Sequence, residues 1–508
     1  MARYGSFKWG SGTKWGASTL DRRLTWAIEV DWNDDGVFDG SNEMSYMLDM
    51  NIRRGREFFM KSDGSGFEPR FAGNIRITLK NNSGRFDPFN PSGPLYGLLE
   101  SNQRIRIRVK DEATSIIYPV FFGYVEDIRP NYSTLPTVTL TASDGIKYLG
   151  GTPAVSSTVY TTRAYTTAIS DVLTAAGWED ATAIDTTLSD TMPFFWLNGN
   201  SAYGQIVDLT DAVLGNFYIS ATGAATFIPR TYGDSSLVSF SDHDALKDWQ
   251  IRTPSPRYTV QNVVKIYNRA RRSNTNVTLW TLTDKPQVLA GDSIIVWAAY
   301  SYNNQDVPAT TVTPPVATTD YTSNTATDGS GADLTAAFTV ALTTFATTGK
   351  LVITNTGGTS GYVTLLKVRG DAITPDDFTF AQTTSPASIV IYGERQFIVK
   401  TNWLQDLNTA IDQASVLIGI LPFPRRYPQF MVRGQPAKQF LLDLTNQATL
   451  GFASIRYSDI MRVGYIEHNV TAATAGNICD TIFYFEPDLG GGGGGGAWTF
   501  PATFPMTF

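Results

Sequence analysis

The sequence is poor in the residues on which most enzyme and metal sites are built. Among its 508 residues there is one cysteine, Cys479, which excludes an intrachain disulfide. The two histidines, His243 and His468, are too few to complete a zinc site of His and Cys ligands with it. Neither histidine lies near a nucleophile-elbow sequence, whereas a pair of sugar-cleaving carboxylates would leave no recognisable pattern. We therefore predict no catalytic residue, no organic cofactor and no enzyme activity.

Charge and long apolar runs are also scarce. Charged residues make up 17% of the chain and the net charge is -7, which argues against a dedicated nucleic-acid binder, because phosphate neutralisation needs clustered Lys and Arg. No uninterrupted apolar run reaches the roughly 18 residues that a membrane-spanning helix needs. Residues 1–23 lack the apolar core of a signal peptide. We expect a soluble protein made in the cytoplasm.

Aromatic residues, by contrast, make up 12% of the chain, and Thr, Ser, Gly and Asn are abundant. This composition favours strands and turns over long helices. The length predicts roughly three to five domains of ~100–200 residues each. Two alternating runs, 74–80 and 104–110, place apolar side chains on one face and polar side chains on the other. They predict an antiparallel sheet with one dry face.

The second of these runs carries a row of four cations. Arg104, Arg106, Arg108 and Lys110 share one strand face, and the sequence beside them offers nothing to neutralise them. Because like charges in a row repel, the row calls for an acidic partner, and we predict an interface here. A solvated strand face is the alternative.

An acidic loop follows the expected strand 24–30. Its first part matches the opening of a calcium loop, with oxygen ligands at positions one, three and five and a glycine at six. The match ends at position twelve, where Asn42 stands in place of a glutamate. An Asx-turn loop between strands is therefore the alternative. The candidate calcium ligands are Asp31, Asn33, Asp35, Asp39 and Glu43.

Three stretches have apolar residues at helical spacing, and short alternating runs later in the chain indicate strands. The predicted helices are 161–178, 202–214 and 404–421, and the predicted strands near the end are 429–433, 439–444 and 460–468.

The chain ends in a flexible linker and an apolar peptide. Seven glycines, 490–496, precede a tail whose prolines forbid a helix. Large apolar side chains are costly to expose, so we predict that the tail docks in a partner's groove. The residues expected to make this interface are Trp498, Phe500, Phe504 and Phe508.

A series of short motifs resembles, in its order, the N-terminal barrel of tailed-phage hub proteins, the trimeric proteins that close the end of the tail tube. The motifs are Ala72-Gly73, Gly84-Arg85-Phe86, Gly93-Pro94-Leu95, the basic strand 104–110, the run Val120 to Ile128 and the run Val138 to Gly145. The resemblance to this family of baseplate and tail-tip proteins covers roughly Trp26 to Val470, less an unmatched insertion.

The resemblance implies a mainly β fold with a few helices, of the α+β class. It implies two tube-like antiparallel β-barrel domains with a small α/β domain between them, and the Thr-, Ala- and Gly-rich insertion adds a β-sandwich-like module. The expected boundaries are 1–23 for an N-terminal arm, 24–155 for the first barrel, 156–235 for the small domain, 236–305 and 387–486 for the second barrel with its helix, 306–386 for the inserted module, and 487–508 for the linker and anchor peptide.

The resemblance also implies a structural hub of a phage tail tip or baseplate. Such a minor tail protein closes the tail tube, adapts it to a distal spike or fibre, and opens for DNA ejection. We expect a homotrimer, with the tail tube or a distal tail protein above it and a spike or fibre protein below.

In that setting phage DNA would pass through the lumen without specific binding. The host cell surface is a further candidate partner. The protein would be part of the virion after assembly in the host cytoplasm. The basic row would meet acidic groups of an adjacent barrel. The alternatives are a receptor- or glycan-binding tail protein and a cell-wall hydrolase.

Overall fold

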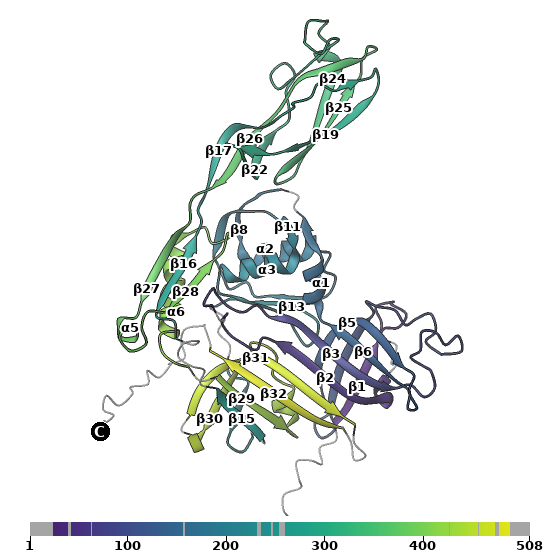
Figure 1. The fold of residues 1–508 in the computed structure, drawn as a ribbon, viewed down its shortest axis with the longest axis vertical. Coiled ribbons are helices and arrows are strands. Elements are labelled where there is room, and N and C mark those ends of the chain that lie inside the picture. Colours follow the sequence, from purple (N-terminus) through teal and green to yellow (C-terminus); the bar gives the residue numbers. More distant parts are fainter. Residues whose placement is uncertain are drawn as a thin grey trace, which may run out of the picture.

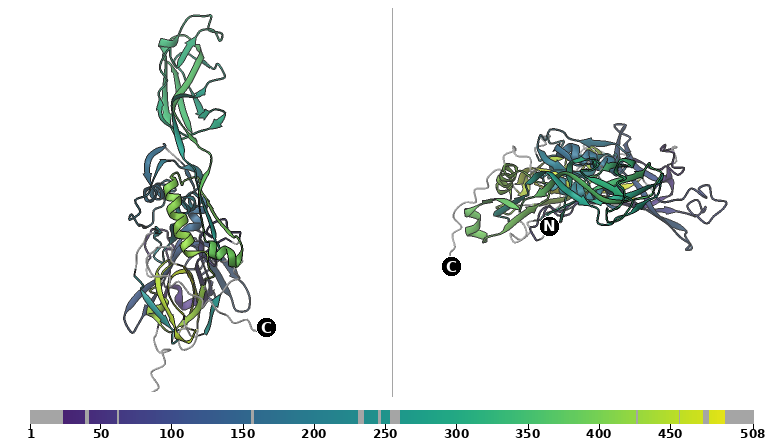
Figure 2. Two further views of the ribbon diagram at one scale, coloured as in Figure 1. Left: turned by 90° about the vertical axis from the view of Figure 1, so that its left-hand side faces the viewer. Right: turned by 90° about the horizontal axis from the view of Figure 1, so that it is seen from above.

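The computed structural model describes residues 24–38, 42–61, 63–155, 158–230, 235–244, 247–252, 260–425, 427–455, 457–472 and 477–487. These residues form mainly strands with a few helices, which confirms the predicted fold class. Figure 1 shows a broad sheet at one end of the molecule, a helical layer in the middle and a narrow β-arm at the other end. The side view in Figure 2 shows that the arm continues the long axis. The predicted N-terminal arm, 1–23, lies outside the described residues.

A single large sheet forms the lower part of Figure 1. Among the described residues it has 12 strands, in the order β1-β4-β5-β6-β3-β2-β31-β32-β29-β15, with β30 beside β31 and β14 beside β30. Its N-terminal strands are β1 (Leu24–Val30), β2 (Met47–Gly55), β3 (Phe71–Lys80), β4 (Arg104–Asp111), β5 (Ile116–Asn131) and β6 (Thr137–Ser143). Its C-terminal strands are β14 (Val238–Ser241), β15 (Lys247–Arg252), β29 (Tyr427–Arg433), β30 (Gln447–Phe452), β31 (Tyr457–Thr471) and β32 (Ile478–Glu486). The two regions expected as separate barrels are thus joined through the antiparallel pair β2 and β31.

The N-terminal half of this sheet follows the alternation in the sequence. In β3, Ile75, Ile77 and Leu79 are buried, and they belong to one hydrophobic core with Trp26 of β1. The polar side chains of β3 point to the other face, as period-two alternation requires. The prediction of a sheet with one dry face is therefore confirmed for this strand.

Two glycines allow close approach at the seam between β2 and β31. Gly55 has a φ of +110°, and a Cβ on it would lie 2.2 Å from the carbonyl oxygen of Gly464. A Cβ on Gly464 would in turn lie 2.8 Å from a carboxylate oxygen of Glu486. Since only glycine adopts this backbone conformation without strain and leaves this space, side chains here would push the strands apart.

The helical layer contains part of the region assigned to the second barrel. Its helices are α1 (Gly145–Gly151), α2 (Tyr165–Ala175), α3 (Ala202–Asp211), α5 (Pro386–Tyr392) and α6 (Leu407–Ile420). Its strands are β7 (Pro153–Val155), β8 (Tyr160–Ala164), β9 (Thr182–Ile184), β10 (Thr191–Phe195), β11 (Asn198–Ser201), β12 (Asn216–Ile219), β13 (Ala225–Ile228), β16 (Val263–Asn268), β27 (Thr379–Thr384) and β28 (Gln396–Lys400). One hydrophobic core unites α2, α3, α6, β16 and β28. Residues 263–268 and 396–420 therefore pack with the small domain rather than with a barrel of their own.

Helix predictions in this layer are mostly confirmed. The helices expected at 202–214 and 404–421 are α3 and α6, and the first residues of the stretch 161–178 form β8 before α2 begins. None of the helices in the described ranges is both long enough and apolar enough to span a bilayer. The strand predicted at 439–444 is wrong, because Pro436 starts the short helix α7 (Pro436–Gln439) and no strand follows before β30.

The β-arm corresponds to the predicted inserted module, but it begins earlier in the chain than the expected residue 306. Its strands are β17 (Arg271–Thr281), β18 (Gln287–Val288), β19 (Ser293–Ala299), β20 (Ser301–Tyr302), β21 (Gln305–Asp306), β22 (Ala309–Thr313), β23 (Tyr321–Asn324), β24 (Phe338–Thr344), β25 (Thr348–Asn355) and β26 (Gly361–Pro375). Because β17 pairs β26 and β19 pairs β25, residues 271–305 belong to the arm and not to the second barrel. At the other boundary, 379–384 pair with β16.

The arm should be removable without unfolding the rest. Arg271 and Pro375 are directly paired across β17 and β26, so the two ends of the arm lie side by side. Replacing 273–373 with an Asn-Gly turn should leave the melting temperature of the remaining chain within a few degrees of its value in the intact protein. A deletion of 306–386, which removes β26 and β27, is the matched control and should unfold the helical layer. Equal unfolding after both deletions, measured by circular dichroism, would contradict these boundaries.

Candidate functional site

The centre of the basic row on β4 has an acidic partner within the chain. Glu29 of β1 lies directly opposite Arg106. Its carboxylate accepts hydrogen bonds from Arg106 Nε at 2.8 Å and from Arg108 Nη2 at 2.7 Å. Burial raises the pKa of the Glu29 carboxyl, but the hydrogen bonds and charges of the two arginines outweigh it and hold the pKa below its usual value. The guanidinium of Arg106 also lies 4.1 Å from the centre of the Phe38 ring.

The two ends of the row have further local partners. Arg104 lies 3.7 Å from a carboxylate oxygen of Asp180, and Lys110 pairs with Glu112 at 2.8 Å. The expectation that nothing local neutralises the row is therefore wrong, because the β1–β4 register supplies Glu29. The predicted interface with an adjacent barrel stays a prediction.

The candidate calcium loop is arranged around Asp31. Its buried carboxylate accepts hydrogen bonds from the backbone N–H groups of Asp35 at 3.2 Å and Gly36 at 2.8 Å. The amide of Asn33 donates to the Asp35 carboxylate at 2.8 Å. These contacts give the loop an Asx-type geometry in which the carboxylates are occupied by protein donors.

Glu43, another of the predicted metal ligands, has protein partners of its own. Glu43 starts the short helix η2 (Glu43–Tyr46), accepts a hydrogen bond from Trp32 Nε1 at 3.0 Å and pairs with Arg85 at 2.6 Å. Asp39 lies outside the described residues. Within the described ranges no group of three or more His, Cys, Asp or Glu side chains could hold a metal ion. The calcium site stays a prediction.

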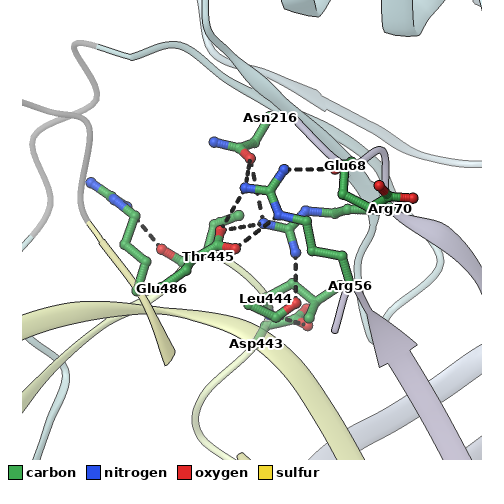
Figure 3. Close-up of polar contacts among 10 residues, drawn as sticks. Arg56, Glu68, Arg70, Asn216, Asp443, Leu444, Thr445 and Glu486 are labelled. Carbon is green, nitrogen blue, oxygen red and sulfur yellow. Dashed lines mark hydrogen bonds and ion pairs between the residues drawn. The ribbon is translucent and has the colours of Figure 1, made fainter. Parts of the chain in front are cut away.

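A buried cluster of arginines and a carboxylate crosses the seam between the two halves of the large sheet (Figure 3). Glu486, the last residue of β32, accepts hydrogen bonds from Arg56 Nε at 2.8 Å and from Arg70 Nη2 at 3.0 Å. Arg70 also donates to the Gly464 carbonyl oxygen at 2.9 Å. Both arginines contact the side-chain oxygen of Asn216 in β12 at 3.4 Å. Both sheet halves and the helical layer thus meet at this cluster.

The electrostatics of this cluster favour a structural role. Arg56, Arg70 and Glu486 are all buried. Burial raises the pKa of Glu486, but the charges of the two arginines outweigh it and hold the pKa below its usual value. Its contribution to stability is therefore complete above the ordinary glutamate pKa and is lost as the pH falls through the lowered one. A carboxylate that stays ionised and fully hydrogen-bonded holds neighbours in place and has no proton to donate near neutral pH.

A further ion pair also connects the two halves of the large sheet with the helical layer. Arg54 of β2 pairs with Asp443 at 2.8 Å and donates to the carbonyl oxygen of Ile219 in β12 at 2.7 Å. Asp443 accepts a hydrogen bond from the backbone N–H of Ala221 at 2.8 Å. Together these three ion pairs and Asn216 form what we call the junction, defined by Arg54, Arg56, Arg70, Asn216, Asp443 and Glu486.

His468 and Cys479 are close in space but unsuited to catalysis. Thr481 Oγ1 lies 2.9 Å from His468 Nδ1 and 3.8 Å from Cys479 Sγ. Burial lowers the pKa of His468 to about 3 and raises the pKa of the Cys479 thiol to about 12. Both groups are therefore neutral at physiological pH, whereas cysteine nucleophiles act as thiolates beside a basic imidazole. His243 is exposed on a turn.

Glu486→Gln should be strongly destabilising, because it leaves two buried guanidinium groups without their counter-charge. We expect the free energy of unfolding to fall by about 3–5 kcal/mol, measured by urea unfolding. The matched control is Asp480→Asn on the same strand, whose partner Arg433 has a side chain that is 39% exposed. The control should cost less than about 1 kcal/mol. Comparable losses from the two variants would show that the junction is no stronger than a surface ion pair.

His468 should make stability depend on pH. The imidazole has a folded pKa of about 3, below its ordinary value of 6.5, so the unfolded chain binds its proton first and stability falls as the pH drops from 6.5 towards 3. Between pH 7 and pH 5 the free energy of unfolding of the parent protein should fall by roughly 2 kcal/mol more than that of the His468→Gln variant. The exposed His243→Gln serves as the control and should behave like the parent. Parallel curves of unfolding free energy against pH for the parent and His468→Gln would show that the pKa of His468 is not lowered in the folded protein.

Known proteins similar to this chain are found among solved structures. No protein-family model matches the sequence, and no curated protein matches it. Among solved structures, the 43 kDa tail protein of prophage MuSo2 from Shewanella oneidensis is similar, with a TM-score of 0.50 and 11% identity, over 92% of this chain and 99% of that one. The tail protein from Neisseria meningitidis MC58 aligns over 92% of this chain and 98% of its own length, with a TM-score of 0.49 and 8% identity.

The likeness to the MuSo2 protein extends over almost all of both chains. At 11% identity, this similarity shows the fold alone. The chain therefore has the fold of a prophage tail protein, which confirms at the level of fold the resemblance to phage tail hub proteins drawn from the sequence.

Proposed function

We propose that this chain is a structural, non-enzymatic hub of a phage tail tip or baseplate. The observation that carries the proposal is its similarity to the MuSo2 prophage tail protein over 92% of this chain and 99% of that one. In this role the protein closes the tail tube, adapts it to a distal spike or fibre, and opens for DNA passage at infection. It is part of the virion and is assembled in the host cytoplasm.

The large sheet suits a ring-forming role. Each chain contributes two sheet halves joined edge to edge. Three copies in a homotrimer would therefore present six sheet halves, which match a tail tube of six-fold symmetry. The proposed neighbours are the tail tube or a distal tail protein above and a spike or fibre protein below. Phage DNA passes through the lumen without being specifically bound.

The basic row supplies a contact for a neighbouring copy. Glu29 carries one negative charge against the two positive charges of Arg106 and Arg108, so the centre of the row keeps a positive surplus. The side chains of Arg106 and Arg108 are 32% and 37% exposed. Acidic groups of an adjacent subunit would complete the neutralisation, more strongly at low salt.

The proposed function is tested by removing the gene from the phage. A phage that carries a nonsense mutation in this gene should yield no infectious particles, and the protein supplied in trans should restore them and be found at the tail tip by immunogold labelling. Normal infectious tails without the protein, or labelling elsewhere on the virion, would refute the proposal.

The C-terminal peptide is proposed to hold the next protein of the tail. Its four aromatic residues lie outside the described residues, which end at Pro487. Seven extended glycines reach at most ~25 Å, and burying each aromatic side chain contributes about 1.5–3 kcal/mol. The aromatic residues are Trp498, Phe500, Phe504 and Phe508.

Deletion of 497–508 should therefore give a folded hub with an unchanged melting temperature, in tails that have lost their distal protein. The composition of purified tails, measured by quantitative mass spectrometry, checks this. A deletion of equal length within 1–23 is the control for general loss of terminal residues. Truncated tails that retain the full set of distal proteins would rule out the anchor.

A second candidate function is receptor or glycan binding by the arm. The arm projects away from the sheet (Figure 1), and Ile295 and Trp297 of β19 are each 57% exposed on it. The ring of Trp297 lies 5.9 Å from that of Phe345, a surface on which a partner can pack. Phage whose hub lacks 273–373 would separate the two functions, since intact tails that fail to adsorb favour receptor binding by the arm.

A further inference from the structure

The sheet β27-β16-β28 has one covered face and one open face. Ile266, Ala381 and Phe397 belong to the core that α6 closes. Because side chains alternate along a strand, the neighbouring residues point away from α6. In that direction Tyr267 of β16 lies between Phe380 of β27 and Lys400 of β28. We call this open side the cation–aromatic face, defined by Lys265, Tyr267, Arg269, Phe378, Phe380 and Lys400.

Cations and aromatic rings are interleaved on this face. Lys400 Nζ lies 4.2 Å from the centre of the Phe378 ring, and the guanidinium carbon of Arg269 lies 4.8 Å from the same centre. Phe380 is 48% exposed, and its ring centre is 5.2 Å from that of Tyr267. Phe380 thus keeps ring surface open to solvent, whereas Lys400 and Arg269 lie over the Phe378 ring.

The positive charge of the face is not balanced within the described part of the chain. Lys265 donates to the amide oxygen of Gln396 at 3.1 Å, and Arg269 donates to the amide oxygen of Asn402 at 3.2 Å. No ion pair within the described ranges reaches Lys265, Arg269 or Lys400. This differs from the basic row of β4, where every cation has a carboxylate partner.

Arg271 lies beside this face, but its guanidinium packs against the helical layer, where Trp403 belongs to the core. Its guanidinium carbon lies 4.1 Å from the centre of the Trp196 ring and 4.7 Å from that of Trp403, two rings whose centres are 5.1 Å apart. It donates to the backbone carbonyl of Asn402 at 2.9 Å, the same residue that Arg269 contacts. Burial first, and then the charge of Arg269, lower the pKa of Arg271 to about 9, so it is still charged at neutral pH.

We propose that the cation–aromatic face binds an anionic glycan, a sugar polymer that carries phosphate or carboxylate groups. Sugar rings have apolar C–H faces that pack on exposed aromatic rings, and their acidic substituents would meet Lys265, Arg269 and Lys400 through charge-assisted hydrogen bonds. Exposed amides beside the rings, on Gln382 and Gln396, can hydrogen-bond sugar hydroxyls.

Charge also argues for a glycan over a nucleic acid. A nucleic acid carries a phosphate on every nucleotide and binds through many phosphate contacts. This face offers few cations on a chain of net charge -7, which repels a dense polyanion. A glycan with scattered acidic groups fits the small number of cations better. The inference does not rest on the proposed function, because the binding is a property of the isolated chain.

The test measures binding of the intact chain to immobilised polymers by biolayer interferometry. Phosphomannan supplies a phosphate-bearing glycan, polygalacturonate a carboxylate-bearing one, dextran a neutral one and oligothymidylate a nucleic acid. We expect binding to phosphomannan or polygalacturonate that weakens as salt is added, and no binding to dextran. Which of the two anionic glycans binds more tightly identifies the acidic group.

Two variants test the assignment of the site. The double variant Lys265→Gln/Lys400→Gln should weaken anionic-glycan binding by about tenfold or more, since two charge-assisted contacts are lost. Phe380→Ala should weaken it about fivefold through the loss of stacking. The control is Lys80→Gln, an exposed lysine at the end of β3 in the large sheet, and it should bind like the parent. All variants are first checked for an unchanged melting temperature.

Each possible result of these measurements either supports or overturns the proposal. Loss of binding in the double variant with normal binding in Lys80→Gln supports the proposal. Absence of binding to both anionic glycans, equal binding to dextran, tighter binding to oligothymidylate, or equal binding by parent and double variant would each overturn it. If Phe380→Ala misfolds, the double lysine variant still decides the question, because both of its residues lie on the surface.

Discussion

The rest of the structure depends on one buried carboxylate held between two arginines. Glu486 closes β32 at the point where β2, β31 and β12 meet, and its bonds to Arg56 and Arg70 bring together both halves of the sheet and the helical layer. Such a cluster is stable only while every charge has its partner, because an uncompensated charge in this interior costs several kcal/mol. The contact therefore favours a single arrangement of the three parts.

Local patterns in the sequence predicted much of the fold. The alternation in 74–80 and 104–110 gave the strands β3 and β4, and helical spacing gave α3 and α6, because these patterns reflect which face of each element is buried. The partition into domains was less accurate. Whether β16 and β17 belong to a barrel, the small domain or the arm depends on pairing with strands some hundred residues away, and alternation says nothing about the partner of a strand.

The junction could not be found from the sequence for the same reason. Arg56 and Glu486 are separated by 430 positions, and either residue alone is consistent with an exposed charge. The one local hint was Gly55 beside Arg54 and Arg56, since a glycine between arginines at a strand end marks close backbone approach. Glu29 was missed in a similar way. It stands in the first predicted strand, but only the β1–β4 register brings it opposite Arg106.

We infer that the junction makes one cooperative frame of the two sheet halves and the helical layer. Native-state hydrogen exchange of the intact chain tests it most directly, because it reports the opening free energy of each segment separately. We expect the amides of β2, β31 and β12 to exchange with one common opening free energy, and Glu486→Gln to lower that free energy in all three strands together. Exchange of the two sheet halves with different free energies, with only β32 affected by the substitution, would contradict it.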